Sequence, residues 1–303
     1  MSKLTFIIKD YFLSIADIPG YVKFLNKFSD KRLSHPVIFV FKNIIKPENR
    51  ILFYPERPVH SSVAFKLCAL LGYQIISNSE NTKAVPFKYK NSTFFDESEL
   101  GNIPSGKKIL NGKNTDISKN KVAEIFGEVF GYSLEVNPLE YNGKIVVKSN
   151  LNALHKGEVA DGPLEEGELK EGMVYQKEID NKTEDELVLD YRVPIHGNEI
   201  PLVYLKYRPV ANRFSNENNF VRLKNTSDIF NDNELKKILY FAGEMGIDYG
   251  ELDILRDKDN KIYIVDVNSA PWGPPNGLPL KDQKEALVIL KKSFKELIDK
   301  SCS

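Results

Sequence analysis

One segment constrains the fold more than any other: residues 249–268, in which two β-rich runs flank Asp259 and Asn260. Asp and Asn tolerate the positive φ of a tight turn, so the pattern predicts an antiparallel hairpin with these two residues as its loop. Because side chains alternate along a strand, one face of this hairpin is polar. The side chains on that face belong to Glu251, Asp253, Asp266 and Asn268.

The predicted pairing places Asp253 opposite Asp266, and Glu251 opposite Asn268. Like charges that face each other across two strands are destabilising, so a countercharge is expected. A hard divalent cation would supply it, and Mg²⁺ typically binds one or two carboxylates together with phosphate oxygens. Asp253, Asp266 and Asn268 are therefore the predicted metal ligands. The alternative is a solvent-facing polar stripe in a shifted register.

The loop after the hairpin, residues 269–279, contains four prolines, two glycines and the only tryptophan of the chain. Such a composition predicts a stiff, shaped loop. A wall of a binding site and an ordinary connection at a domain edge explain it equally well.

The N-terminal part shows an α/β rhythm. Residues 1–35 are expected to form short helices, and the apolar runs 37–41 and 51–54 predict buried strands. A helix over 61–71 and a strand over 73–76 follow. Strand, helix and strand joined by short links indicate a parallel sheet.

The remainder combines helices with strands that pair back on one another. A helix that begins at Asp116 or Ser118 is expected to end at Phe130. Further strands are predicted over 144–148, 173–179, 187–194, 200–208, 249–256 and 261–267, and further helices over 234–246 and 282–298. The expected fold class is α/β (α+β), with an N-terminal parallel-sheet domain followed by two lobes built on antiparallel sheets. Domain boundaries are expected at 1–114, 115–180 and 181–303.

Charge and cysteine content bear on nucleic-acid binding and on the location of the protein. The 42 Lys and Arg residues balance 42 Asp and Glu residues, and a nucleic-acid binder usually has a basic excess. The two cysteines lack metal-site or redox spacing, so a cytoplasmic location is expected. No apolar stretch approaches the ~20 residues that a membrane span needs.

The hairpin and its loop resemble the ATP-grasp superfamily of carboxylate–amine ligases. The matching residues are Asp253, the Asp266-Val267-Asn268 triplet and the run from Ser269 to Gly273, with one residue inserted before the glycine. The resemblance covers roughly residues 115–295. It implies a two-lobed ATP-grasp fold with ATP and Mg²⁺ as cofactors, Mn²⁺ being a substitute. It also implies an ADP-forming ligase that makes an amide through an acyl phosphate.

Further residues resemble the superfamily's nucleotide contacts. Lys148 matches the lysine on a strand that meets the phosphates, and Lys119 and Lys121 straddle the position of a second phosphate-facing cation, with Lys121 preferred. His155 lies in the loop that closes over the phosphates, which here has few glycines. The resemblance further implies adenine and ribose contacts from Gln176, Lys177, Ile179, Asp190 and Arg192.

The resemblance also implies groups at the transferred phosphoryl. Arg213 and Asn216 are the expected catalytic residues together with Lys148, and Arg208 and Arg222 fall in the same region. Here the segment 149–172 is expected to act as a lid that shields the acyl phosphate from water.

Two other functions stay open at this point. A kinase on the same scaffold would phosphorylate an alcohol and stop there, and an inactive module would bind nucleotide without turnover. The expected partners are a small-molecule, peptide or sugar-acid carboxylate and an amine. A homodimer is compatible with the sequence.

Overall fold

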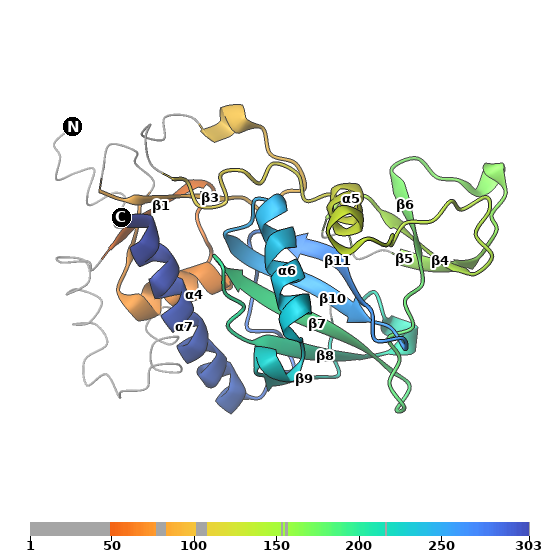
Figure 1. The fold of residues 1–303 in the computed structure, drawn as a ribbon. Helices are drawn as coiled ribbons and strands as arrows, with labels where there is room; N and C mark the ends of the chain where they lie inside the picture. The colour runs from red at the N-terminus through yellow and green to blue at the C-terminus, as the bar shows by residue number, and fades with distance from the viewer. Residues whose placement is uncertain are drawn as a thin grey trace.

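The computed structural model describes residues 49–76, 83–100, 108–152, 154, 157–215 and 217–302. The helices expected within 1–35 and the strand expected over 37–41 lie outside these ranges. The strands of the described residues form one parallel and two antiparallel sheets, which confirms the predicted fold class. Figure 1 shows the parallel sheet at one end, the larger antiparallel sheet in the centre and the smaller one at the other end.

The N-terminal sheet has the order β2-β1-β3, and β1 runs parallel to both neighbours. Ser62 caps the helix α4 by accepting a hydrogen bond from the amide of Phe65, and Gly72 ends it at a φ of 70°. The strand β3 was not expected, because its sequence includes a proline and a lysine, Lys88, which is buried over the Phe95 ring. The elements are β1 (Arg50–Pro55), α4 (Val63–Leu71), β2 (Gln74–Ile76) and β3 (Val85–Tyr89).

The central sheet is antiparallel, with the order β11-β10-β7-β8-β9. Its strands are β7 (Leu187–His196), β8 (Val203–Pro209), β9 (Phe220–Lys224), β10 (Tyr249–Arg256) and β11 (Ile262–Asn268). Apolar side chains of one face, such as Val193, Leu252 and Ile254, are fully buried. They share a core with Phe126 and Phe241 from the helices above them.

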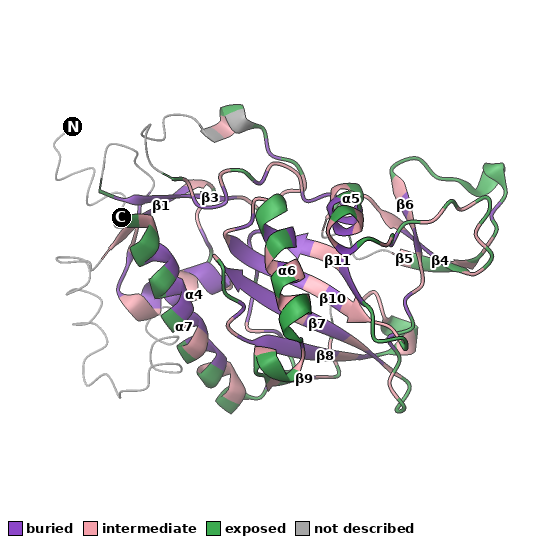
Figure 2. Cartoon of the chain, in the orientation of Figure 1, coloured by how far each residue is buried: buried purple, intermediate pink, exposed green. Residues whose placement is uncertain are grey.

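Two helices supply that cover, α5 (Lys119–Phe130) and α6 (Asp232–Glu244). Ser118, one of the two expected starts, caps α5, and Gly131 ends it at a φ of 81°. The outward side of α6 is exposed, whereas the strands beneath it are buried (Figure 2). Part of the opposite face packs against other apolar residues through Tyr204 and Tyr249. The rest of that face carries charged side chains such as Arg192, Lys206 and Asp253.

The small sheet has the order β5-β4-β6 and consists of β4 (Lys144–Ser149), β5 (Gly157–Asp161) and β6 (Met173–Lys177). The sequence predicted β4 and β6 but assigned β5 to a loop, because β5 is mostly exposed and polar. Short 3₁₀ turns cover Glu97–Leu100, Glu166–Glu168, Val210–Asn212 and Thr226–Asp228.

The hairpin of β10 and β11 has the predicted register at its functional end. Asp253 pairs with Asp266, and Glu251 pairs with Asn268. The predicted two-residue loop is wrong, because Asp257 pairs with Lys261 and three residues form the turn, with Asn260 at a φ of 68°. A bulge next to Ile254 compensates for the shift.

The helix α7 (Leu280–Cys302) packs against both the N-terminal sheet and the central sheet. Its buried side chains, including Leu287 and Phe294, form one core with β1, β3 and α4 and with Tyr204 and Tyr249 of the central sheet. None of the helices in the described ranges combines the length and the apolarity that crossing a membrane requires.

A buried histidine beneath α7 gives a testable pH dependence. His196 Nδ1 lies 2.6 Å from the Ser293 hydroxyl, and burial lowers the pKa of His196 to about 3. The unfolded chain therefore takes up a proton near pH 6.5 that the folded chain rejects, so stability falls as the pH drops below that value.

We expect the wild type to lose about 2 kcal/mol more unfolding free energy than His196→Gln between pH 7 and pH 5, because the slope approaches 1.4 kcal/mol per pH unit. Urea unfolding of both proteins at the two pH values measures it. The wild type and His196→Gln have all other titrating groups in common. Equal losses of unfolding free energy in the two proteins would therefore show that His196 is not protonated on unfolding.

Candidate active site

The polar face of the central sheet gathers charged side chains from four adjacent strands. Residues two apart on a strand share a face, so alternation sends these groups to the side that α5 and α6 leave open. The contributing residues are Asp190 and Arg192 on β7, Lys206 and Arg208 on β8, Asp253 on β10, and Asp266 and Asn268 on β11.

Asp253 lies at the centre of this face and already has cationic partners. Arg192 donates from Nε at 3.1 Å and from a terminal nitrogen at 2.9 Å to the two Asp253 oxygens, and Lys206 lies 3.4 Å away. Burial alone would raise the pKa of Asp253, but the charges of Arg192 and Lys206 outweigh it and hold this pKa well below its usual range.

This pairing corrects the argument from charge alone. Arginine and lysine supply part of the countercharge that the sequence analysis assigned wholly to a divalent cation. Arg192, expected at the nucleotide, pairs with Asp253 and lies 3.5 Å from the buried Glu251. Lys206 was missed, although it alternates with Arg208 along β8 and strand periodicity would have placed it on the same face.

Asp266 and Asn268 have fewer side-chain partners among the described residues than Asp253 has. Asp266 Oδ1 accepts a hydrogen bond from the Val267 amide at 3.1 Å, and no cation within the described residues forms an ion pair with it. The side-chain nitrogen of Asn268 is buried and has no partner among the described residues. Burial raises the pKa of Asp266, while Lys119 and Lys148 oppose that rise.

The donor set fits Mg²⁺. Two opposed carboxylates and a neighbouring amide oxygen are hard ligands, and a carboxylate with two hydrogen-bonded oxygens retains lone pairs for a metal. No group of three or more His, Cys, Asp or Glu residues in the described ranges could hold a metal. The set is therefore of the kind in which Mg²⁺ relies on one or two carboxylates and on oxygens of the substrate.

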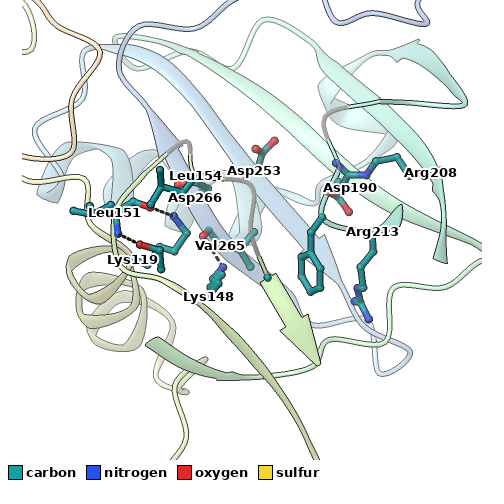
Figure 3. Close-up of a pocket in the computed structure, with 13 residues that line it drawn as sticks. Lys119, Lys148, Leu151, Leu154, Asp190, Arg208, Arg213, Asp253, Val265 and Asp266 are labelled. Atoms are coloured by element: carbon teal, nitrogen blue, oxygen red, sulfur yellow. Dashed lines mark hydrogen bonds and ion pairs between the residues drawn. The ribbon is translucent and has the colours of Figure 1, made fainter. Parts of the chain in front are cut away.

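A cavity opens beside this set, and two lysines enter it from other elements. Lys119 and Lys148 lie on the same side as Asp266, with Asp190 and Arg208 on the other side and Asp253 between them (Figure 3). We call this the first cavity. Its remaining lining residues are Ser149, Leu151, Leu154, Gly157, Arg213, Phe214 and Val265.

The two lysines make the first cavity cationic. Lys148 projects from β4 and its Nζ lies 3.5 Å from the Val265 carbonyl, while Lys119 Nζ donates to the Leu151 carbonyl at 3.0 Å. Burial lowers the pKa of Lys148 to about 8, with the neighbouring Asp266 raising it and Lys119 lowering it further. Among the described residues, both ammonium groups bond only to neutral backbone oxygens, so an anion can replace those contacts.

The preference for Lys121 over Lys119 is not supported by the geometry. Lys119 is the first residue of α5 and lines the first cavity. Lys121 lies two positions later and is half-buried, and its ammonium group pairs with Glu124 at 3.0 Å. Two residues span about 200° of a helix, which turns the side chain of Lys121 away from the side of Lys119.

Other expected nucleotide residues are engaged inside the protein. Asp190 accepts from Arg208 and from Asn181 at 2.9 Å. Arg213 lines the first cavity, but its guanidinium donates to Glu178 and, at 3.1 Å, to the Ile179 carbonyl.

The remaining expected residues are dispersed. Gln176 is buried in β6, and Lys177 donates to the Tyr263 hydroxyl at 3.2 Å. Arg222 is exposed on β9, beside the Tyr207 and Phe220 rings. Asn216 and His155 lie outside the described residues, and their expected roles stay predictions.

A second cavity adjoins the first and shares Arg208, Phe214, Asp253 and Asp266 with it. Its other walls come from segments next to α4 and β3, from the central sheet and from the loop after β11. These walls include Ser61, Lys66, Asn91, Arg192, Lys206, Asn218, Asn268 and residues 270–276. The carboxylates of the hairpin therefore lie at the junction of two compartments.

Comparisons with known proteins find similar chains among solved structures. No family model and no curated protein matches the chain. Among solved structures, a RimK-domain ATP-grasp protein from Sphaerobacter thermophilus is similar, with 9% identity over 82% of this chain and 99% of that one, and a TM-score of 0.48. A RiPP-associated ATP-grasp ligase from Chryseobacterium gregarium has 14% identity over 83% and 97%, and a TM-score of 0.46.

The ATP-grasp ligase PsnB in complex with a precursor variant, Mg and ADP has 12% identity and a TM-score of 0.39. That alignment covers 62% of this chain and 62% of PsnB, less than two thirds of its length.

Proposed function

We propose that the protein is an ATP-dependent, ADP-forming carboxylate–amine ligase. The observation that carries the proposal is the opposition of Asp253, Asp266 and Asn268 on the hairpin to Lys119 and Lys148 across one cavity. Oxygen ligands on one side and ammonium groups on the other match the needs of a polyphosphate with its metal.

On one side of the first cavity the residues bind phosphate, and on the other side they bind the metal. Lys148 and Lys119 bind phosphate oxygens, and their positive charges offset the negative charge of the triphosphate. Asp253, Asp266 and Asn268 would hold Mg²⁺, which supplies charge neutralisation at the phosphates when it is bound. Arg192 fixes the orientation of Asp253 through two hydrogen bonds, so the hairpin is organised before the nucleotide arrives.

Because the two cavities meet at the hairpin, a substrate in the second cavity can reach a nucleotide in the first. A carboxylate oxygen of the substrate, held in the second cavity, attacks the γ-phosphorus, and the bond to ADP breaks. The amine then attacks the acyl carbon of the acyl phosphate, a proton leaves the nitrogen, and inorganic phosphate departs. Lys206 and Arg208 border both the carboxylate site and the hairpin, where they stabilise the negative charge that develops.

Amino-acid, peptide and sugar-acid carboxylates are the candidate donors. Precursor peptides are bound in some of the similar solved structures, so a peptide carboxylate belongs in the first screen. The predicted domain division, the cytoplasmic location and a homodimer are compatible with this function and are proposed with it.

Calorimetry with ATP, in the presence and absence of Mg²⁺, tests the proposal first. We expect binding that depends on Mg²⁺, followed by ADP release when a carboxylate and an amine are added together. Mass spectrometry of the product separates an amide from a phosphorylated alcohol, which would indicate a kinase instead. A protein that binds no nucleotide would contradict the proposal.

The two lysines of α5 provide a matched pair of variants. Lys119→Ala is expected to weaken ATP binding by about tenfold, the usual scale for losing a charge-assisted hydrogen bond. Lys121→Ala removes the same charge two residues away and is expected to leave binding unchanged. The reverse order in a calorimetric titration would restore Lys121 as the phosphate ligand.

A further inference from the structure

The only tryptophan of the chain, Trp272, lies at the rim of the second cavity with 60% of its surface exposed. A large aromatic side chain usually buries most of its area, so its exposure beside a cavity needs an explanation. The same cavity is lined by Arg192, Asp266 and Asn268, and Trp272 therefore borders the compartment assigned to the carboxylate substrate.

The backbone holds Trp272 in this position. Residues 271–273 pair in an antiparallel bridge with residues 61–63, through hydrogen bonds from the Val63 amide to the Pro271 carbonyl at 3.0 Å and from the Gly273 amide to the Ser61 carbonyl at 3.4 Å. Lys66 Nζ donates to the carbonyls of both Ser61 and Gly273, which fastens the two segments together. The exposed ring is thus presented by a fixed backbone.

The same pairing leaves one edge of the loop unused. In an antiparallel pair, hydrogen bonds from the flanking residues mean that the N–H and C=O of the central residue point away from its partner. Trp272 is that central residue opposite Ser62, and neither of its backbone groups has a partner in the described part of the chain. An extended peptide backbone could pair with them, as in strand addition.

The cationic side chains of the second cavity can bind an acidic occupant. Four cationic side chains, those of Lys66, Arg192, Lys206 and Arg208, line it against the two carboxylates of Asp253 and Asp266. Arg208 also pairs with Asp190, and Arg192 also lies 3.5 Å from Glu251. A carboxylate entering beside the hairpin nevertheless meets ammonium and guanidinium donors on several sides. An apolar residue next to that carboxylate would come to lie at the rim, where Trp272 is.

We propose that Trp272 is a specificity-determining residue for an extended acidic peptide. Its ring receives an apolar side chain adjacent to the reacting carboxylate, and its backbone N–H and C=O pair with the peptide main chain. This inference rests on the proposed ligase function for the identity of the reacting group. A free amino acid or a sugar acid would leave both features of Trp272 unused.

Binding can be measured apart from turnover, because the single tryptophan makes intrinsic fluorescence a direct report of this rim. The probes are acetyl-Leu-Glu-Leu-amide, acetyl-Gly-Glu-Gly-amide and free glutamate, each titrated with and without a non-hydrolysable ATP analogue. We expect the leucine peptide to change the fluorescence and to bind about tenfold more tightly than the glycine peptide.

Variants are compared by calorimetry, which does not need the fluorophore. Trp272→Ala is expected to remove the tenfold preference, and Trp272→Phe is expected to keep most of it. Tyr240→Ala is the control, because Tyr240 is equally exposed at 60% but lies on α6 on the other side of the sheet. Melting temperatures check that each variant is folded.

The outcomes separate this inference from the ligase proposal. Equal binding of both peptides by wild type and Trp272→Ala, with ATP-dependent amide formation intact, would overturn the role of Trp272 and leave the ligase standing. Failure of the wild type to bind any of the peptides would also overturn it. A preference that depends on Trp272 in a protein that binds no ATP would support the peptide site and contradict the ligase.

Discussion

Replacing Arg192 with methionine is expected to lower the unfolding free energy by about 3–5 kcal/mol, the scale of breaking a buried ion pair from one side. Arg192 donates two hydrogen bonds to Asp253 and lies 3.5 Å from Glu251. Without it, Lys206 is the remaining cation that forms an ion pair with Asp253 among the described residues, and Glu251 loses the cation that lies 3.5 Å from it. Burial raises the pKa of Glu251 to about 7 even with Arg192 present.

Urea unfolding of Arg192→Met, Asp253→Asn and the double variant measures this expectation. The double variant should recover part of the loss, because no uncompensated charge is left at Asp253. Arg222→Met is the matched control, since Arg222 is exposed on β9 and its removal is expected to cost less than about 1 kcal/mol. Equal losses for the two arginine variants would contradict the assigned role of Arg192.

Replacing Asp266 and Asn268, two of the proposed metal ligands, is expected to have the largest effect on activity. Asp266→Ala/Asn268→Ala should lower ATP turnover by at least about 100-fold, the scale of removing one preorganised electrostatic contact at a reacting centre. The variant should also bind ATP equally with and without Mg²⁺, because its remaining candidate ligand, Asp253, is already hydrogen-bonded to Arg192.

Asp259→Asn provides the comparison on the same hairpin, because Asp259 is exposed at the turn. It removes a carboxylate without touching the polar face, and its turnover should equal that of the wild type. Circular dichroism and melting temperature show whether the double variant is folded. Mg²⁺-dependent binding that survives in a folded double variant would refute the assignment of Asp266 and Asn268 as ligands.

The hairpin shows how far local chemistry determines a site before any tertiary contact is known. Alternation along a strand was enough to bring Asp253, Asp266 and Asn268 together, and the correct pairing emerged although the turn was misplaced by one residue. The three-residue turn and the bulge were invisible in the sequence, because each changes the register by one and the two changes cancel.

Contacts between residues far apart in the sequence were harder to predict. Nothing near Arg192 in the sequence shows that it faces Asp253, since the pairing of β7 with β10 joins residues 61 positions apart. The choice between Lys119 and Lys121 depended on a sequence spacing, which does not distinguish two residues that lie on different faces of a helix. Helix caps and strand periodicity were predictable because both are encoded by neighbouring residues.

The position of α7 has a consequence for how the chain reaches its fold. The helix supplies Leu287, Leu290 and Phe294 to the core that also contains Phe53 and Phe87 of the N-terminal sheet. During synthesis, that sheet leaves the ribosome long before α7 and must keep its apolar face exposed in the meantime. Completion of the N-terminal core is therefore a late event, and a chain that stops before Leu280 is expected to aggregate rather than accumulate as a folded fragment.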